Sequence, residues 1–205
     1  MTVLTIPPTR PEDIDQAKDF LFKAFGEKRW TEGAYLQLSD GYNRLIELSE
    51  GRLVVPAMPT PEHQDIVWRI GEALKAWARK HGGRAFVAPL PVRLWAGKFR
   101  EPDALLYSVE HRDRVEQQYG GPPDLVVEVL SPGTEDIDTD DKVTEYAQAG
   151  IPEYWIVDSN SPRVEQYVIK GQRYRRHARL SAGHMLRAVT LPDLAISLDS
   201  LYTRE

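Results

Sequence analysis

Two apolar segments joined by a helical one constrain the fold of this chain most strongly. Residues 125–130, "LVVEVL", form one apolar run, and residues 153–158, "EYWIVD", form the other. Short apolar runs bounded by proline and glycine predict buried strands. The segment between them predicts a helix from about residue 140 to residue 149, which Gly150 ends. This order predicts two strands of one sheet connected by a helical crossover.

The other predicted elements place this crossover in a mixed sheet. A helix is predicted from Pro61, after the N-cap Thr60, to the glycines at 82 and 83. Its apolar residues form one stripe at helical spacing. Strands are predicted in the segments 44–55, 84–95, 103–108, 163–170 and 173–180, the last two as a hairpin across Gly171. Because a single crossover lies among these strands, we expect an α/β (α+β) domain with a mixed β-sheet flanked by helices.

The N-terminal part of the chain differs from the rest in its predicted elements. Apolar residues at helical spacing predict a helix from about Pro11 to Phe25, and "TEGAYLQLS" at 31–39 predicts a shorter one. We therefore expect residues 1–42 to form an N-terminal helical segment that packs on the core. Residues 43–205 would form the main domain, and the whole chain a single structural domain.

Composition excludes several classes of protein. The chain has 205 residues and no cysteine, which excludes disulfides, thiolate zinc sites and a cysteine nucleophile. It lacks an apolar run of ~18 residues and a signal peptide, so we expect no membrane span and a cytoplasmic protein. The net charge of −5 argues against non-specific coating of nucleic acid but permits a local basic face.

Three acidic residues lie in apolar strand segments. Asp103 opens "ALLY", Glu128 interrupts "LVVEVL", and Glu47 lies within "RLIEL". Acidic residues are disfavoured in strands, so each either faces solvent or has a functional reason to be there. For Glu128 the solvent-facing alternative is weaker, because Val126 and Leu130 share its face of the strand.

Carboxylates on adjacent strands suit a divalent cation. Magnesium prefers hard oxygen ligands and keeps several waters, so one or two protein carboxylates suffice. A nearby lysine would orient the attacking water, and Lys142 on the following helix is the candidate. Asp138, Lys142 and Tyr146 share one helix face at four-residue spacing. The alternative is that Lys142 is an ordinary surface lysine paired with Asp138.

The segments that contain these acids resemble the motif of a known family. The segments "EPDALLY" and "DLVVEVLSP" resemble the motif of the PD-(D/E)XK nuclease superfamily. In the usual motif a lysine stands two residues after the second acid, where this chain has Leu130. With "IELSEGRLV", "PEHQDIVWRIGEAL" and "DTDDKVTEYAQAGIPEYWIVD", the match extends over about residues 43–170 and is similar to the Uma-type restriction-endonuclease-like family.

The resemblance implies a restriction-endonuclease-like core and a role for each site residue. The family places its lysine on the following helix, so Lys142 would replace the one missing at position 130. Asp103 and Glu128 correspond to the metal-binding acids and Glu47 to an additional upstream glutamate. The expected ion is Mg²⁺, or alternatively Mn²⁺, and the backbone carbonyl of Val129 would complete its protein ligands.

Further residues have alternatives that the sequence leaves open. His63 matches the family's histidine and would contact a phosphate, orient Glu47 or simply pack at the helix start. Tyr146 would touch the substrate or pack beneath Lys142. Basic residues between 163 and 187 would contact phosphates or protect an exposed strand edge; the candidates for DNA contact are Arg173, Arg175 and Arg176.

The leading functional hypothesis is a metal-dependent endonuclease that hydrolyses DNA phosphodiester bonds with metal-activated water. Such an enzyme is expected to act as a homodimer, because two-fold symmetric dimers are the commonest assemblies. One alternative is a nuclease fold that binds nucleic acid or a partner without cleaving it. Another is a hydrolase of a small phosphoester.

Overall fold

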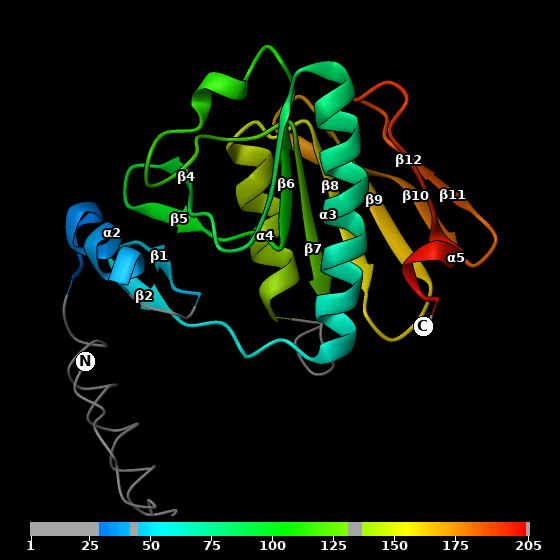
Figure 1. The fold of residues 1–205 in the computed structure, drawn as a ribbon. Helices are drawn as coiled ribbons and strands as arrows, with labels where there is room; N and C mark the ends of the chain where they lie inside the picture. The colour runs from blue at the N-terminus through cyan, green and yellow to red at the C-terminus, as the bar shows by residue number, and fades with distance from the viewer. Residues whose placement is uncertain (1–28, 42–44, 131–136, 204–205) are drawn as a thin grey trace, which may run out of the picture.

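The structure of the chain, a computed structural model, describes residues 29–41, 45–130 and 137–203 (Figure 1). For residues 41 and 137–140 it describes the backbone alone. The helix expected at 11–25 lies outside the described residues. The proposed division at residue 42 therefore stays a prediction.

A six-stranded mixed sheet forms the centre of the molecule, with the strand order β10-β9-β8-β7-β6-β3. Strands β7 and β8 pair in parallel, whereas the other neighbours pair antiparallel. The predicted crossover is thus confirmed. The strands are β3 (Arg84–Val87), β6 (Ala104–Tyr107), β7 (Leu125–Leu130), β8 (Glu153–Asp158), β9 (Arg163–Lys170) and β10 (Arg173–Ser181).

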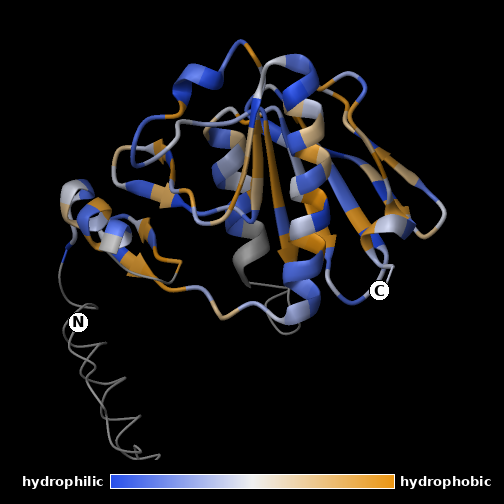
Figure 2. Ribbon diagram, viewed as in Figure 1, coloured by the Kyte–Doolittle hydropathy of each residue, from blue (hydrophilic) through white to orange (hydrophobic). Residues whose placement is uncertain are grey.

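Helices α3 (Pro61–His81) and α4 (Ile137–Gln148) lie on opposite faces of this sheet (Figure 1). Alternate side chains of β7 point to the two faces. Val127 packs in the core under α3, and Val126 packs with Tyr146 of α4. Figure 2 shows the apolar strands enclosed between the two helices. Two covered faces explain why "LVVEVL" is apolar at every position except Glu128, instead of alternating.

The ends of α3 follow the sequence prediction. The Thr60 hydroxyl accepts a hydrogen bond from the backbone N–H of His63 at 3.2 Å. Gly82 adopts the left-handed conformation with φ 73° and its N–H bonds to the carbonyl of Ala78. The N-cap fixes the first turn of the helix, and with it the position of the His63 backbone.

A second, smaller antiparallel sheet lies beside the main one, with the strand order β2-β1-β5-β4. Helix α2 (Glu32–Gly41) packs on it through Tyr35, whose ring lies 4.9 Å from that of Phe99. The segment 84–95 thus divides between two sheets, because Pro89 and Pro91 lie between its strands and cannot donate ladder hydrogen bonds. The strands are β1 (Glu47–Ser49), β2 (Arg52–Val54), β4 (Val92–Trp95) and β5 (Lys98–Arg100).

Several short elements and one helix boundary were not predicted. Helix α4 begins at Ile137, three residues earlier than expected. No helix among the described residues is long and apolar enough to span a membrane. The unpredicted elements are β5, given above, and η1 (Arg112–Arg114), β11 (Met185–Arg187), β12 (Ala195–Ser197) and α5 (Leu198–Leu201).

Candidate active site

Two of the predicted acids meet on neighbouring strands. Asp103 directly precedes β6, Glu128 lies within β7, and the register pairs Ala104 with Val127. Both acids are buried, Glu128 to 6% exposure, and both line a cavity of about 810 Å³. The solvent-facing alternative is therefore wrong for both residues.

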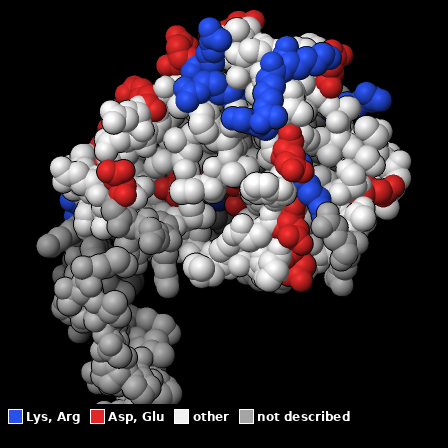
Figure 3. Space-filling view, in the orientation of Figure 1, with Lys and Arg blue, Asp and Glu red and all other residues white. Residues whose placement is uncertain are grey.

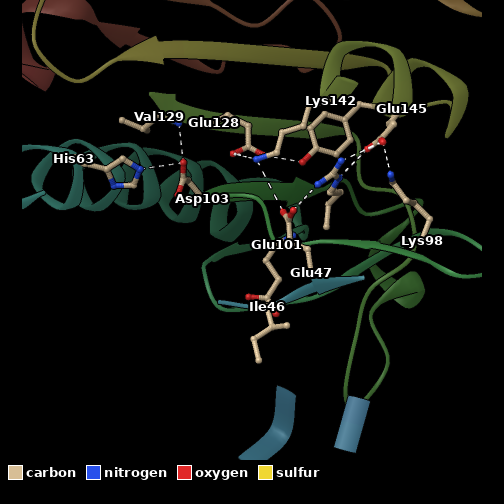
Figure 4. A network of polar contacts seen from close by, with 12 residues as sticks. Ile46, Glu47, His63, Lys98, Glu101, Asp103, Glu128, Val129, Lys142 and Glu145 are labelled. Carbon is tan, nitrogen blue, oxygen red and sulfur yellow. Dashed lines mark hydrogen bonds and ion pairs between the residues drawn. The ribbon is translucent and has the colours of Figure 1, made fainter. Parts of the chain in front are cut away.

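Helix α4 brings Lys142 to these acids (Figure 4). The Lys142 ammonium lies 3.1 Å from Oε2 of Glu128 and 4.0 Å from Oε1 of Glu47. Its side chain is buried, so the alternative of an ordinary surface lysine is wrong. The lysine of the following helix thus reaches the site that Leu130 leaves without one.

Tyr146 holds the other oxygen of Glu128. Its hydroxyl donates a 2.6 Å hydrogen bond to Oε1 of Glu128, and its ring meets that of Tyr154 edge-on at 5.2 Å. The side chain is fully buried. Of the two alternatives for Tyr146, the structure therefore favours packing inside the protein over contact with a substrate.

His63 orients Asp103 rather than Glu47. Oδ2 of Asp103 lies 3.2 Å from Nε2 of His63 and accepts a 2.7 Å hydrogen bond from the backbone N–H of Val129. Burial lowers the pKa of His63, but the hydrogen bond and charge of Asp103, with the charge of Glu128, outweigh it and raise the pKa above its ordinary value.

The surroundings of Glu128 shift its pKa in opposite directions. Burial raises the pKa of Glu128, Lys142 lowers it, and the charges of Asp103 and Glu47 raise it again, with a net increase. Three acids within interaction range repel one another unless positive charge lies among them. Lys142 supplies one such charge, and the cavity leaves room for another.

The residues fit a divalent cation with an incomplete protein cage. Within the described ranges, no three acidic or histidine side chains converge into a full ligand set. Both described hydrogen bonds of Asp103 use Oδ2, which leaves Oδ1 for a ligand. Two carboxylates and the Val129 carbonyl suit Mg²⁺, because this ion completes its shell with water.

A buried ionic network supports Glu47, and sequence reasoning missed its other members. Arg100 donates to Oε2 of Glu47 at 2.5 Å and to both oxygens of Glu145 at 2.7 and 3.1 Å. Lys98 forms an ion pair with Glu145 as well. Since Glu145 and Lys142 lie on one helix, the network ties α4 to β5 and β1.

Glu101 is a further buried acid beside this network. Its backbone N–H donates to Oε1 of Glu47 at 3.2 Å, and its Oε2 has no hydrogen-bond partner in the part of the chain that the structure describes. Burial and the Glu47 charge raise the pKa of Glu101 to about 7. The sequence signal for these residues is "KFRE", charged residues in a strand-like segment just before Pro102 and Asp103.

The three candidate arginines lie away from the carboxylates. Arg173, Arg175 and Arg176 are exposed on β10, an edge strand three positions from β7. They do not line the cavity, and Arg176 pairs with Glu165 at 3.5 Å. Their contact with DNA stays a prediction.

The family comparison includes all four candidate catalytic residues. Residues 33–199 match the model of the Uma2 family, described as "Putative restriction endonuclease". The chain belongs to the Uma2 family. The resemblance seen in the sequence is thereby confirmed, and the matched range includes Glu47, Asp103, Glu128 and Lys142.

A solved structure shares the fold of this Uma2 chain. It is described as a putative nuclease belonging to DUF820 from Anabaena variabilis, with a TM-score of 0.65 and 17% sequence identity over 82% of this chain and 96% of that chain. This confirms a restriction-endonuclease-like core with a mixed sheet flanked by helices. No curated protein matches the Uma2 chain.

Proposed function

We propose that this Uma2 protein is a metal-dependent endonuclease that hydrolyses DNA phosphodiester bonds. The observation that carries the proposal is the 3.1 Å contact between Lys142 of α4 and Glu128 of β7. Lys142 thus provides, from the next helix, the lysine that the usual motif carries two residues after the second acid. A lysine and two acids of neighbouring strands around one cavity are the parts that this chemistry requires.

Asp103, Glu128 and the backbone carbonyl of Val129 would hold Mg²⁺ or Mn²⁺. The bound ion would lower the pKa of a water and offset charge on the phosphoryl group. Lys142 would orient that water and stabilise the negative charge that develops on the phosphate. Glu47, held by Arg100, would keep the ammonium of Lys142 in position, or join a second ion.

The remaining contacts keep the two acids oriented. Tyr146 and Lys142 each bind one oxygen of Glu128, which favours the charged form of that carboxyl. His63 and the Val129 amide hold Oδ2 of Asp103. This preorganisation would spare the site from reorganising when the substrate arrives.

The proposal includes a partner and an assembly. The partner is DNA, and a homodimer would carry two such sites. The cysteine-free composition supports the cytoplasm as the compartment.

A cleavage screen tests the proposal. The purified chain would be incubated with single-stranded, duplex and branched DNA and with RNA, in Mg²⁺, Mn²⁺ or EDTA. We expect cleavage of DNA that requires the divalent ion. Asp103→Asn and Glu128→Gln keep the shape of each side chain and remove its charge, so both should abolish cleavage while the chain remains folded.

The alternatives give different results in the same screen. A non-catalytic binding module would leave every nucleic acid intact in all metals. A hydrolase of small phosphoesters would turn over a model phosphodiester but no polymer. DNA cleavage by Asp103→Asn at the wild-type rate would overturn the assignment of the site.

A further inference from the structure

The cavity beside the carboxylates has an apolar wall that the proposed chemistry does not use. Trp68 of α3 and Met58 of the segment before it line this cavity, yet they are 66% and 70% exposed. Val55, in the same segment as Met58, is 57% exposed. Large apolar side chains exposed together next to a cavity indicate a binding surface.

Helix geometry places this wall close to the acids. His63, which holds Asp103, and Trp68 both line the cavity and lie five residues, about 1.4 helical turns, apart on α3. Gln64 and Trp68 are four residues apart and both line the cavity.

A loop bonded to Asp103 adds uncharged residues to the cavity lining. The loop 88–91, with Pro89 and Pro91, lines the cavity, and the Ala88 amide donates to the carbonyl of Asp103 at 3.0 Å. This bond ties the loop to the backbone of the proposed metal ligand. A flat, uncharged group could lie in the cavity with an apolar surface near it and a phosphate at the acids.

The charges around the cavity do not suit a duplex. Among the described residues that line the cavity, Lys142 is the one lysine and there is no arginine. Glu62, Asp65 and Glu72 are exposed along the neighbouring face of α3. In Figure 3, lysine and arginine side chains gather instead at the upper end of the molecule, over η1 and the end of α3. Duplex binding relies on many phosphate contacts from basic side chains, and this cavity offers a place for one phosphate.

We propose that Trp68, with Met58 beside it, is a stacking platform for one unpaired base of single-stranded DNA, whose phosphate lies at Lys142. This inference rests on the proposed function, because it takes the carboxylate site as the place of the scissile phosphate. Proteins that bind single strands stack the bases on aromatic side chains and contact the backbone with basic side chains, and Lys142 is the basic residue of this cavity. The volume of about 810 Å³ lies within the range of pockets that enclose ligands of nucleotide size.

A four-way binding comparison tests the platform. Fluorescence anisotropy would measure binding of a labelled single strand, with Ca²⁺ in place of Mg²⁺, to wild type and to Trp68→Ala. The same strand with abasic sites keeps every phosphate and lacks the bases. We expect Trp68→Ala to weaken binding of the normal strand roughly 5- to 100-fold, because the stacking of one base is lost. The same variant should weaken binding of the abasic strand by less than about twofold. Trp68→Phe keeps a ring and should retain most of the affinity.

Controls separate this inference from the proposed function. Met185→Ala removes an exposed apolar side chain of β11 that does not line the cavity, and should leave binding unchanged. A blunt duplex should bind more weakly than the single strand. Equal losses on the normal and abasic strands, or tighter binding of the duplex, would overturn the platform even if DNA is cleaved. Absence of cleavage with the stacking pattern intact would refute the endonuclease proposal alone.

Discussion

Glu128 illustrates how a charged residue is accommodated inside an apolar strand. Both of its oxygens bind side chains of one helix, Tyr146 on Oε1 and Lys142 on Oε2. An unpaired carboxylate at this depth would cost several kcal/mol or become protonated. Contacts from α4 offset this cost, so the packing of that helix explains why a glutamate is tolerated inside the apolar strand.

Lys142 is the residue whose replacement most separates catalysis from metal binding. Lys142→Met keeps the length of the side chain and removes the charge that would stabilise the transition state. We expect DNA cleavage to fall about 100- to 1000-fold, measured as the single-turnover rate in Mn²⁺. Lys75→Met, an exposed lysine of α3, is the matched control and should cleave at the wild-type rate.

Position 130 offers a rescue of that variant. Leu130 lines the same cavity and shares a strand face with Glu128, where the usual motif has its lysine. The double variant Leu130→Lys, Lys142→Met should cleave DNA about tenfold faster than Lys142→Met, because the strand returns a positive charge to the site. The same cleavage assay measures it, and a double variant as inactive as Lys142→Met would argue against interchangeable positions.

At the scale of elements, Arg100 connects the small sheet to α4. It lies on β5, is almost fully buried, and contacts Glu47 of β1 and Glu145 of α4. It therefore acts on the site as a positioning residue, through the two elements that carry Glu47 and Lys142. Removing one partner of a buried ion pair leaves charges without compensation.

Arg100→Met should destabilise the fold by about 3–5 kcal/mol, because Glu47 would lose its shortest ion pair and Glu145, among the described residues, would keep only Lys98. Urea unfolding measures this change in the free energy of unfolding. Arg79→Met, at an exposed position of α3, should change it by less than about 0.5 kcal/mol. Equal midpoints for the two variants would show that the network does not hold α4.

The elements also show what the sequence could and could not predict. Helix α3 was predictable because caps and periodicity mark it locally, and β7 because two covered faces make it apolar on both sides apart from Glu128. Strand β5 was not, since "KFR" has three residues and two charges, and its pairing with β1 joins positions some 50 residues apart. The network of Arg100 and Glu145 depends on that pairing, so it could not be assembled from local pattern.

At the scale of the whole molecule, the buried acids link folding to pH and metal. The pKa of Glu101 is raised to about 7, from an ordinary value of 4.5, by burial and by Glu47. The folded chain thus binds protons more tightly than the unfolded chain. Stability should fall as the pH rises from about 4.5 to about 7, by roughly 3 kcal/mol for this carboxyl, and not recover above that range.

Thermal unfolding in EDTA across this pH range measures the effect, and Glu101→Gln should flatten the curve. Glu128 contributes in the same direction, because its pKa is raised as well. Mg²⁺ or Mn²⁺ should restore stability at the upper end of the range, since a cation binds the ionised acids of the folded state. Stability that rises with pH in EDTA would contradict the assigned shifts.

The account depends most on a divalent cation held beside Lys142. The direct test is a crystal of the protein grown with Mn²⁺ and measured for anomalous scattering. The account predicts an anomalous peak bound by carboxylate oxygens of Asp103 and Glu128, with the Lys142 ammonium still in contact with Glu128. Full Mn²⁺ saturation without a peak at these two acids would contradict it.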